Sequence, residues 1–116
     1  MSMLDELQVL GADIPDGLKR FVNNAALYEK MLKKFPAAAE GLPVLEHFES
    51  GNLDAALANA HTLKGMTGNL SLKPLFDAYT EIVALLRAGD PVTAKNLTVG
   101  IVPTQEAMIA CIRTYM

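Results

Sequence analysis

Apolar residues recur at three- and four-residue spacings along almost the whole chain, whereas the strict alternation typical of strands is nearly absent. This pattern is typical of amphipathic helices that pack on one another. We therefore predict an all-α protein. Because the turns between the longer helices are tight, the specific expectation is an antiparallel up-down-up-down four-helix bundle with short N-terminal capping helices.

Two short helices are expected before the first longer one. The first spans about Leu4 to Leu10 and ends at the breaker cluster GADIPDG, which contains two glycines and one proline. The second carries the apolar residues Leu18, Phe21 and Val22. Asn23 or Asn24 can cap the helix that follows, whose apolar positions run from Leu27 to Phe35.

The segment that continues to about Phe48 is interrupted by Pro36, Gly41 and Pro43. A proline inside a helix removes one backbone hydrogen bond and clashes with the preceding turn. The segment is therefore either one kinked helix or two short ones, and we predict the kinked helix.

Helix-end signals divide the middle of the chain. In ESGNLD, Gly51 suits the end of one helix and Asn52 the cap of the next, which places NAHTLKGMTGN (59–69) inside a helix of its own. Ser71 is expected to cap the following helix, with Pro74 in its first turn, and Gly89 is expected to end it.

The last helix is expected to begin at Asp90 and Pro91 and to continue to about Tyr115. It must accommodate Gly100 and Pro103, and both residues disfavour a helix interior. We therefore predict a kink or a break near 100–103.

Length and composition favour one folded domain over residues 1–116. The chain is 51% hydrophobic and 20% charged, so it can bury enough apolar surface to offset the ordering of its backbone. A net charge of -3 and a pI near 5.3 give no basic surface for nucleic acid, and no run of like charges favours direct membrane contact. A protein partner or a small ligand is favoured, and the chain is expected to be a monomer.

The cysteine count and the N-terminus indicate a cytoplasmic location. A single cysteine, Cys111, excludes an internal disulfide and any multi-cysteine metal site. The opening MSMLDELQVL has acidic residues where a signal peptide requires basic ones, and no apolar run is long enough to span a membrane.

A histidine is predicted on the exposed face of the helix that contains NAHTLKGMTGN. At about 100° per residue, with Leu63 directed to the core, His61 lies about 160° away. Lys64, Gly65 and Gly68 surround it at the i+3, i+4 and i+7 positions. The buried face of the same helix is predicted to contain Ala56, Asn59, Ala60, Met66, Thr67 and Leu70.

The surroundings of His61 suit a phosphoryl group. No acidic residue occurs between Asp54 and Asp77, and Lys64 can hydrogen-bond an anion carried by the imidazole. A glycine inside a helix costs roughly 1 kcal/mol relative to alanine, so the two glycines favour a surface cleared for a partner's active site. We predict that His61 is phosphorylated, that Lys64 stabilises the phosphoryl group, and that the docking surface contains Gly65, Gly68 and Leu57.

An ordinary role is also available for each of these residues. Isolated His-x-x-Lys pairs are common on solvated helix faces, and the glycines and the missing carboxylates are what favour the phosphoryl site here.

For His47, near a helix end, we predict a solvated or helix-stabilising role. For Cys111, on an apolar stripe, we predict a buried, unreactive thiol. Neither histidine has a His or Cys at metal-ligand spacing, so no metal site is predicted.

The stretch AHTLKGMTGNL at 60–70 resembles the signature of histidine-containing phosphotransfer (HPt) domains of two-component phosphorelays. In that family an exposed histidine is followed by Leu-Lys-Gly and small residues. GADIPDGLKRFVNNAALYEKMLKKF, GNLDAALANAHTLKG and LLRAGD resemble the family more loosely, so the similarity covers most of residues 10–90. One residue departs from the pattern: Ser71 stands where the family usually has a glycine after Asn-Leu.

The resemblance implies a place in a phosphorelay. His61 would accept a phosphoryl group from the aspartate of a response-regulator receiver domain, or donate one to it, in a pathway that begins at a sensor histidine kinase. Lys64 would steady the phosphoryl oxygens, and Gly65 would give access. No cofactor is expected on this chain, and Mg²⁺ is expected on the partner receiver domain.

Two other functions stay open. The chain has no glycine-rich phosphate loop, so we expect a phosphotransfer intermediate without autonomous kinase activity rather than an enzyme acting alone. One alternative is a helical adaptor that binds similar partners through the same face and is never phosphorylated. The other is the phosphorylated domain of a chemotaxis-type histidine kinase.

Overall fold

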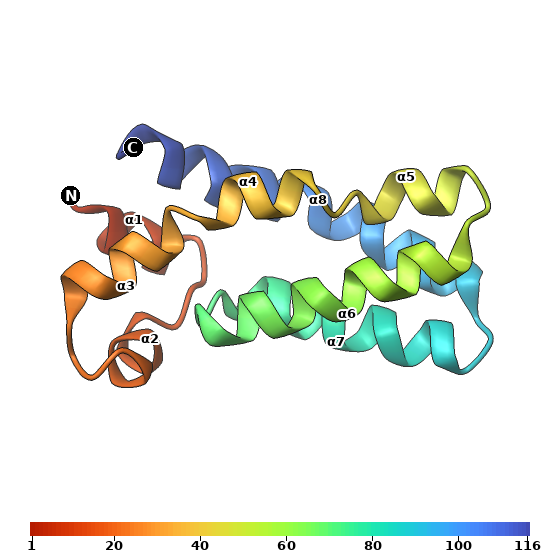
Figure 1. Ribbon diagram of the computed structural model, residues 1–116, viewed down its shortest axis with the longest axis horizontal. Coiled ribbons are helices and arrows are strands. Elements are labelled where there is room, and N and C mark those ends of the chain that lie inside the picture. Colours follow the sequence, from red (N-terminus) through yellow and green to blue (C-terminus); the bar gives the residue numbers. More distant parts are fainter.

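The computed structural model describes all residues from Met1 to Met116 and consists of eight α-helices without a strand (Figure 1). The helices are α1 (Met3–Val9), α2 (Ile14–Arg20), α3 (Ala25–Leu32), α4 (Phe35–Glu40), α5 (Val44–Glu49), α6 (Leu53–Asn69), α7 (Lys73–Arg87) and α8 (Pro91–Thr114). The predicted all-α class is confirmed. None of the helices is long and apolar enough to cross a membrane.

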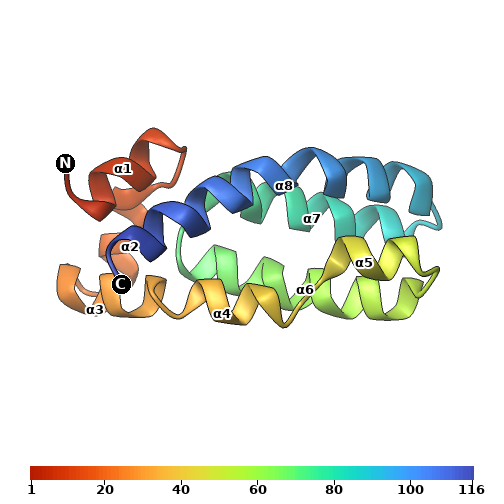
Figure 2. The same ribbon diagram turned by 90° about the horizontal axis from the view of Figure 1, so that it is seen from above.

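The three longest helices, α6, α7 and α8, extend along the long axis of a molecule that measures 40 × 24 × 20 Å. α7 packs between α6 and α8, and α4 and α5 lie end to end beside α6 and α8 (Figures 1 and 2). The short helices α1, α2 and α3 gather at one end with both termini, and the turn from α6 to α7 points to the same end (Figure 1). That end therefore brings the N-terminal helices close to the last turn of α6.

One continuous core of 22 buried apolar residues holds these helices together. Its largest fully buried side chains include Tyr28, Phe35, Leu63, Ile82 and Met108. The predicted core face of α6 is confirmed for the buried residues Ala56, Ala60, Leu63, Thr67 and Leu70, whereas Asn59 and Met66 are half-buried. The orientation of α6 is thus set by its apolar stripe.

Helix starts and ends follow the predicted capping residues at several places. The side-chain oxygens of Asn24, Asn52 and Asp90 accept hydrogen bonds from backbone N–H groups three residues on, at 3.0, 3.1 and 3.1 Å. Gly51 and Gly89 follow the last turns of α5 and α7 with φ angles of +76° and +80°. Glycine adopts this left-handed conformation without strain, so both helices end there.

The chain between 33 and 49 differs from the prediction. It contains two short helices, α4 and α5, separated by residues 41–43, so the single kinked helix is wrong. Pro43 has no N–H group to continue a helix and forces the residue before it toward an extended backbone. α3 also ends earlier than predicted, at Leu32, so that Phe35 begins α4.

We predict a kink or a break near 100–103; α8 continues from Pro91 to Thr114, so there is no break. Pro103 cannot donate to the carbonyl of Val99, but Val99 lies on an exposed face, at 51% exposure, where water can satisfy that carbonyl. Buried residues flank the proline on both sides: Ala94 and Thr98 before it, Met108 and Ile112 after it. Packing on both sides keeps one helix.

The turn between α6 and α7 also differs from the prediction. Ser71 does not cap α7, because Leu72 occupies the N-cap position and makes no side-chain capping bond. Ser71 instead has a left-handed backbone, with φ of +54°. Glycine adopts this conformation more readily than any other residue, and this is the position at which the family resemblance predicts a glycine.

Candidate functional site

His61 lies in the middle of α6 on its exposed face, as the helical wheel predicts. Lys64, almost one turn further on, is half-buried and takes part in no ion pair. Lys73, the other cation of the acid-free window, pairs with Asp77 at 3.4 Å. The ammonium group of Lys64 is therefore available to bind an anion beside His61.

His61 and Lys64 line an open cleft of about 500 Å³ between α2, α6 and the start of α7. From α6 the cleft is lined by His61, Lys64, Gly65, Gly68 and Asn69, and from the turn and α7 by Ser71, Lys73 and Phe76. The residues Asp13, Asp16 and Arg20 line it from the N-terminal side. Phe76 is its one hydrophobic side chain, so the cleft suits a charged group better than an apolar ligand.

The two glycines near His61 have different surroundings. A Cβ atom added at Gly65 would meet nothing within 4 Å, so the surface there is open, as predicted. A Cβ atom added at Gly68 would lie 2.9 Å from Cδ1 of Phe76, closer than real Cβ contacts. Gly68 therefore allows α7 to pack closely on α6. This packing role is not part of the prediction, which places Gly68 on the docking surface.

Leu57, also assigned to the docking surface, does not line the cleft. It is half-buried and packs against the hydrophobic core. The structure thus brings His61, Lys64, Gly65 and Gly68 together and leaves Leu57 apart from them.

Two further residues considered in the sequence lie away from the cleft. His47 is half-buried in the last turn of α5, near a helix end as expected. Cys111 is half-buried in α8, with its Sγ atom 3.9 Å from a carboxylate oxygen of Glu6. Burial, together with this carboxylate, raises the pKa of the Cys111 thiol, which agrees with the predicted unreactive thiol.

The acid-free window of the sequence is not acid-free in space, and this corrects the prediction. Asp13 and Asp16 line the same cleft as His61, although they precede it by more than forty residues. Asp16 is not a free charge, because its Oδ2 atom accepts a hydrogen bond from Nε of Arg20 at 2.8 Å. The cleft therefore contains cations and carboxylates, with the carboxylates on the α2 side.

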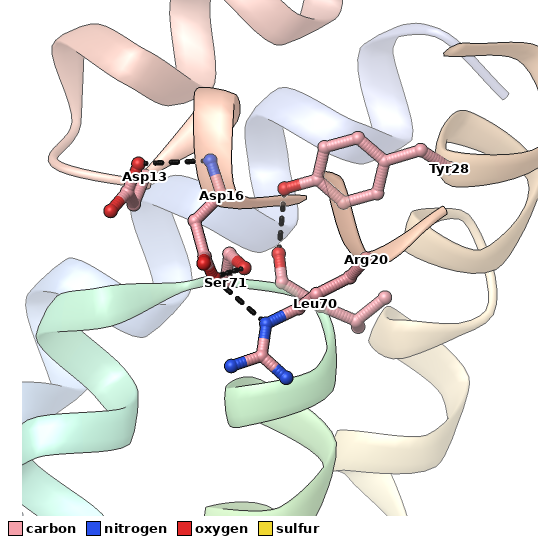
Figure 3. A network of polar contacts seen from close by, with 6 residues as sticks. All are labelled: Asp13, Asp16, Arg20, Tyr28, Leu70 and Ser71. Atoms are coloured by element: carbon pink, nitrogen blue, oxygen red, sulfur yellow. Dashed lines mark hydrogen bonds and ion pairs between the residues drawn. The ribbon is translucent and has the colours of Figure 1, made fainter. Parts of the chain in front are cut away.

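A polar network ties α2 to the turn that ends α6 (Figure 3). The Ser71 hydroxyl donates a hydrogen bond to Oδ2 of Asp16 at 2.6 Å, and the backbone N–H of Asp13 donates to the carbonyl of Ser71 at 2.9 Å. The bond from Ser71 and the bond from Arg20 lower the pKa of the Asp16 carboxyl below its usual value. Asp16 is therefore ionised at neutral pH and can hold both partners.

A second bond attaches α3 to the same turn. The Tyr28 hydroxyl donates to the backbone carbonyl of Leu70 at 2.7 Å, and both groups are buried (Figure 3). Burial and the nearby carboxylates of Asp13 and Asp16 raise the pKa of Tyr28 to about 12, so its hydroxyl keeps its proton. The end of α6 is thus held from α2 and from α3.

Sequence reasoning missed this network because its partners are far apart in the chain. Asp16 and Ser71 are separated by 55 residues. The local signals that exist are weak: the i,i+4 spacing of Asp16 and Arg20, and a serine where the family pattern expects a glycine. α2 ends at Arg20, and Val22, predicted within this helix, lies beyond it with φ of +56°.

The site thus offers a solvent-facing imidazole, an unpaired ammonium group one turn away, and open space above the intervening surface. An imidazole can accept and donate a phosphoryl group, and a nearby cation offsets the added negative charge. Comparison with protein-family models, with curated proteins and with solved structures gave no match.

Proposed function

We propose that this chain is a histidine phosphotransfer domain that carries a phosphoryl group on His61 between the aspartates of response-regulator receiver domains. The observation that carries the proposal is the combination of exposed His61, unpaired Lys64 and the open surface at Gly65 in one polar cleft. The resemblance of residues 60–70 to the phosphotransfer signature also supports it.

The transfer step follows from these groups. An unprotonated ring nitrogen of His61 attacks the phosphorus of a partner's aspartyl phosphate. A nitrogen–phosphorus bond forms while the bond from phosphorus to the acyl oxygen breaks, and the electron pair leaves with the aspartate carboxylate. The imidazole then carries a positive charge until its other nitrogen loses a proton to solvent. Transfer onward reverses these bond changes.

Lys64 and Gly65 affect the charge of the phosphoryl group and the approach of the partner's aspartate. The ammonium group of Lys64 stabilises the phosphoryl oxygens by charge-assisted hydrogen bonds. The open space at Gly65 lets the partner's aspartate approach in line with the ring nitrogen, which phosphoryl transfer requires. Mg²⁺ and the reactive aspartate come from the partner receiver domain, and the first phosphoryl group comes from a sensor histidine kinase.

The packing of the helices supports the same proposal. We interpret the α4–α5 pair, α6, α7 and α8 as the four members of an antiparallel up-down-up-down bundle, with α1 to α3 as its cap. His61 then lies on the outer face of one member, far from its ends. The bundle thus holds the imidazole on an exposed surface, and we propose that the chain acts as a monomeric signalling intermediate in the cytoplasm.

A transfer assay tests the proposal. A panel of receiver domains, each labelled as its aspartyl phosphate, is incubated with the parent chain, with His61→Gln and with His47→Gln as the control. We expect acid-labile label on the parent and on the control and none on His61→Gln, whose helical signal should stay unchanged because the side chain is exposed.

Each other outcome has a distinct meaning. Receiver binding without label on the parent indicates an unphosphorylated adaptor and overturns the proposal. Label that arrives only from a kinase catalytic domain indicates a chemotaxis-type kinase domain. Label retained by His61→Gln moves the site to another residue.

A further inference from the structure

A second hollow adjoins the cleft of His61. It has a volume of about 610 Å³ and lies between the end of α2, α3, α4 and α6. Its walls are mostly apolar and include Phe21, Met31 and Met66. Arg20 and Asn69 are the two residues that line both the cleft and this hollow. A partner that covers His61 and extends toward α3 therefore passes over Arg20 and Asn69.

The Arg20 side chain is hydrogen-bonded through one nitrogen atom, and its other two nitrogen atoms are free. Its Nε atom donates to Asp16, whereas its two terminal nitrogens have no hydrogen-bond partner and point away from Asp16 (Figure 3). The side chain is 49% exposed, so a partner can reach it. Asp16 is in turn fixed by the Ser71 hydroxyl at 2.6 Å. The guanidinium group is therefore pre-organised, which reduces the entropy cost of binding.

The charge around this hollow selects the group that Arg20 can bind. Arg20 and Lys34 line the hollow, and no carboxylate does. The two free terminal nitrogens of an arginine match the two oxygens of a carboxylate or of a phosphoryl group.

His61 does not line this second hollow, so an anion bound in the hollow belongs to the surface of the docked partner. Carboxylates are the anionic side chains of a protein surface, and their two oxygens match the free nitrogens of Arg20. The ligand expected here is therefore a carboxylate on the partner.

We infer that Arg20 is a specificity-determining residue whose free terminal nitrogens bind a carboxylate of the receiver domain docked on His61. This inference rests on the proposed function. Asp16 and Ser71 are positioning residues in it, since they act through the orientation of Arg20. Receiver domains that lack an acidic side chain at this point of their docking surface are discriminated against.

The test uses the receiver domain that gives the fastest transfer in the panel assay, with the intact chain. KM and kcat for transfer, and the Kd for the unphosphorylated receiver, are measured for the parent, Arg20→Gln, Arg20→Lys and Asp16→Asn. Lys19→Gln is the matched control, because Lys19 is an exposed neighbour on α2 that lines neither hollow and forms no ion pair.

We expect Arg20→Gln to raise Kd and KM about tenfold and to reduce their salt dependence, while kcat changes by less than about twofold. Arg20→Lys should recover part of the loss, and Lys19→Gln should match the parent. Asp16→Asn should cost less than Arg20→Gln, because it removes the negative charge that anchors Arg20 and keeps the cation.

Four results overturn the inference. An unchanged Kd for Arg20→Gln, with transfer intact, would show that Arg20 makes no contact with the receiver domain, and the proposed function would stand. A fall in kcat at constant KM means that Arg20 binds the phosphoryl group instead. Equal losses in Arg20→Gln and Asp16→Asn mean that Arg20 only anchors α2. If no receiver transfers label to the parent, the proposed function fails and the inference with it.

Discussion

Gly65 and Gly68 are three residues apart on α6, yet a methyl group added at each would meet different surroundings. At Gly65 the new Cβ atom has no neighbour within 4 Å. At Gly68 it would lie 2.9 Å from Cδ1 and 3.0 Å from Cε1 of Phe76, so the ring or the helix must move. We therefore expect Gly65→Ala to stabilise the protein and Gly68→Ala to lose that gain or more.

The magnitudes follow from two opposing terms. Replacing a glycine by alanine in a helix interior stabilises by about 1 kcal/mol, because the unfolded chain loses freedom. Gly65→Ala should realise this gain, which corresponds to a rise in melting temperature of about 4 °C for a domain of this size. Overpacking costs about 1 to 3 kcal/mol, so Gly68→Ala should lie between no change and about 2 kcal/mol of destabilisation.

The measurement is urea unfolding of the parent and both variants, followed by far-UV circular dichroism. The free energies of unfolding of the two variants should differ by about 1 to 3 kcal/mol, with Gly65→Ala the more stable. Equal stabilities would refute the reasoning, because they would mean that Phe76 does not press on Gly68. A Phe76→Leu background serves as the control: with the ring removed, the two glycines should respond alike.

Three other substitutions test separate parts of the site. Lys64→Ala should slow label transfer without abolishing it, and a rate equal to the parent's would make the lysine an ordinary surface charge. Tyr28→Phe leaves the buried carbonyl of Leu70 without its donor and should lower the free energy of unfolding by about 1 to 3 kcal/mol in urea titrations; no change would mean that water replaces the hydroxyl. Because the folded-state pKa of Asp16 is depressed, its stabilisation is present above the unfolded value near 3.8 and is lost as pH falls through the folded-state pKa. Stability measured from pH 6 to pH 2 should therefore fall less in Asp16→Asn than in the parent, and identical curves would exclude Asp16 from the acid response.

The parts of the fold that sequence predicts well are those governed by neighbours in the chain. Asn52 caps α6 because its side chain reaches an N–H group three residues away, and Gly51 ends α5 because it alone takes a positive φ there cheaply. The exposure of His61 follows from the helical period and the apolar stripe centred on Leu63. None of these depends on knowing what lies beside α6.

The features that sequence missed depend on contacts between distant segments. The bond between Asp16 and Ser71 exists only once α2 is folded against the end of α6. Gly65 and Gly68 lie three residues apart in the same helix. Only the contact of the Phe76 ring from α7 with Gly68 distinguishes them. The separation of α4 from α5 at Pro43 depends on both kinds of information. The proline in the sequence indicates an interruption, but packing decides between a kink and a break.

The stability of α6 has to come from outside the helix. Gly65 and Gly68 together lower its intrinsic helix preference by about 2 kcal/mol relative to alanine. Burial of Leu63 and its neighbouring core residues offsets part of this, and the bonds that Tyr28 and Asp16 make with the following turn hold its C-terminal end. These bonds lie two turns or more beyond His61, so they can fix the helix without occupying the surface above the imidazole. The α2–α3 end of the molecule therefore keeps α6 rigid while its exposed face stays free of side chains at Gly65.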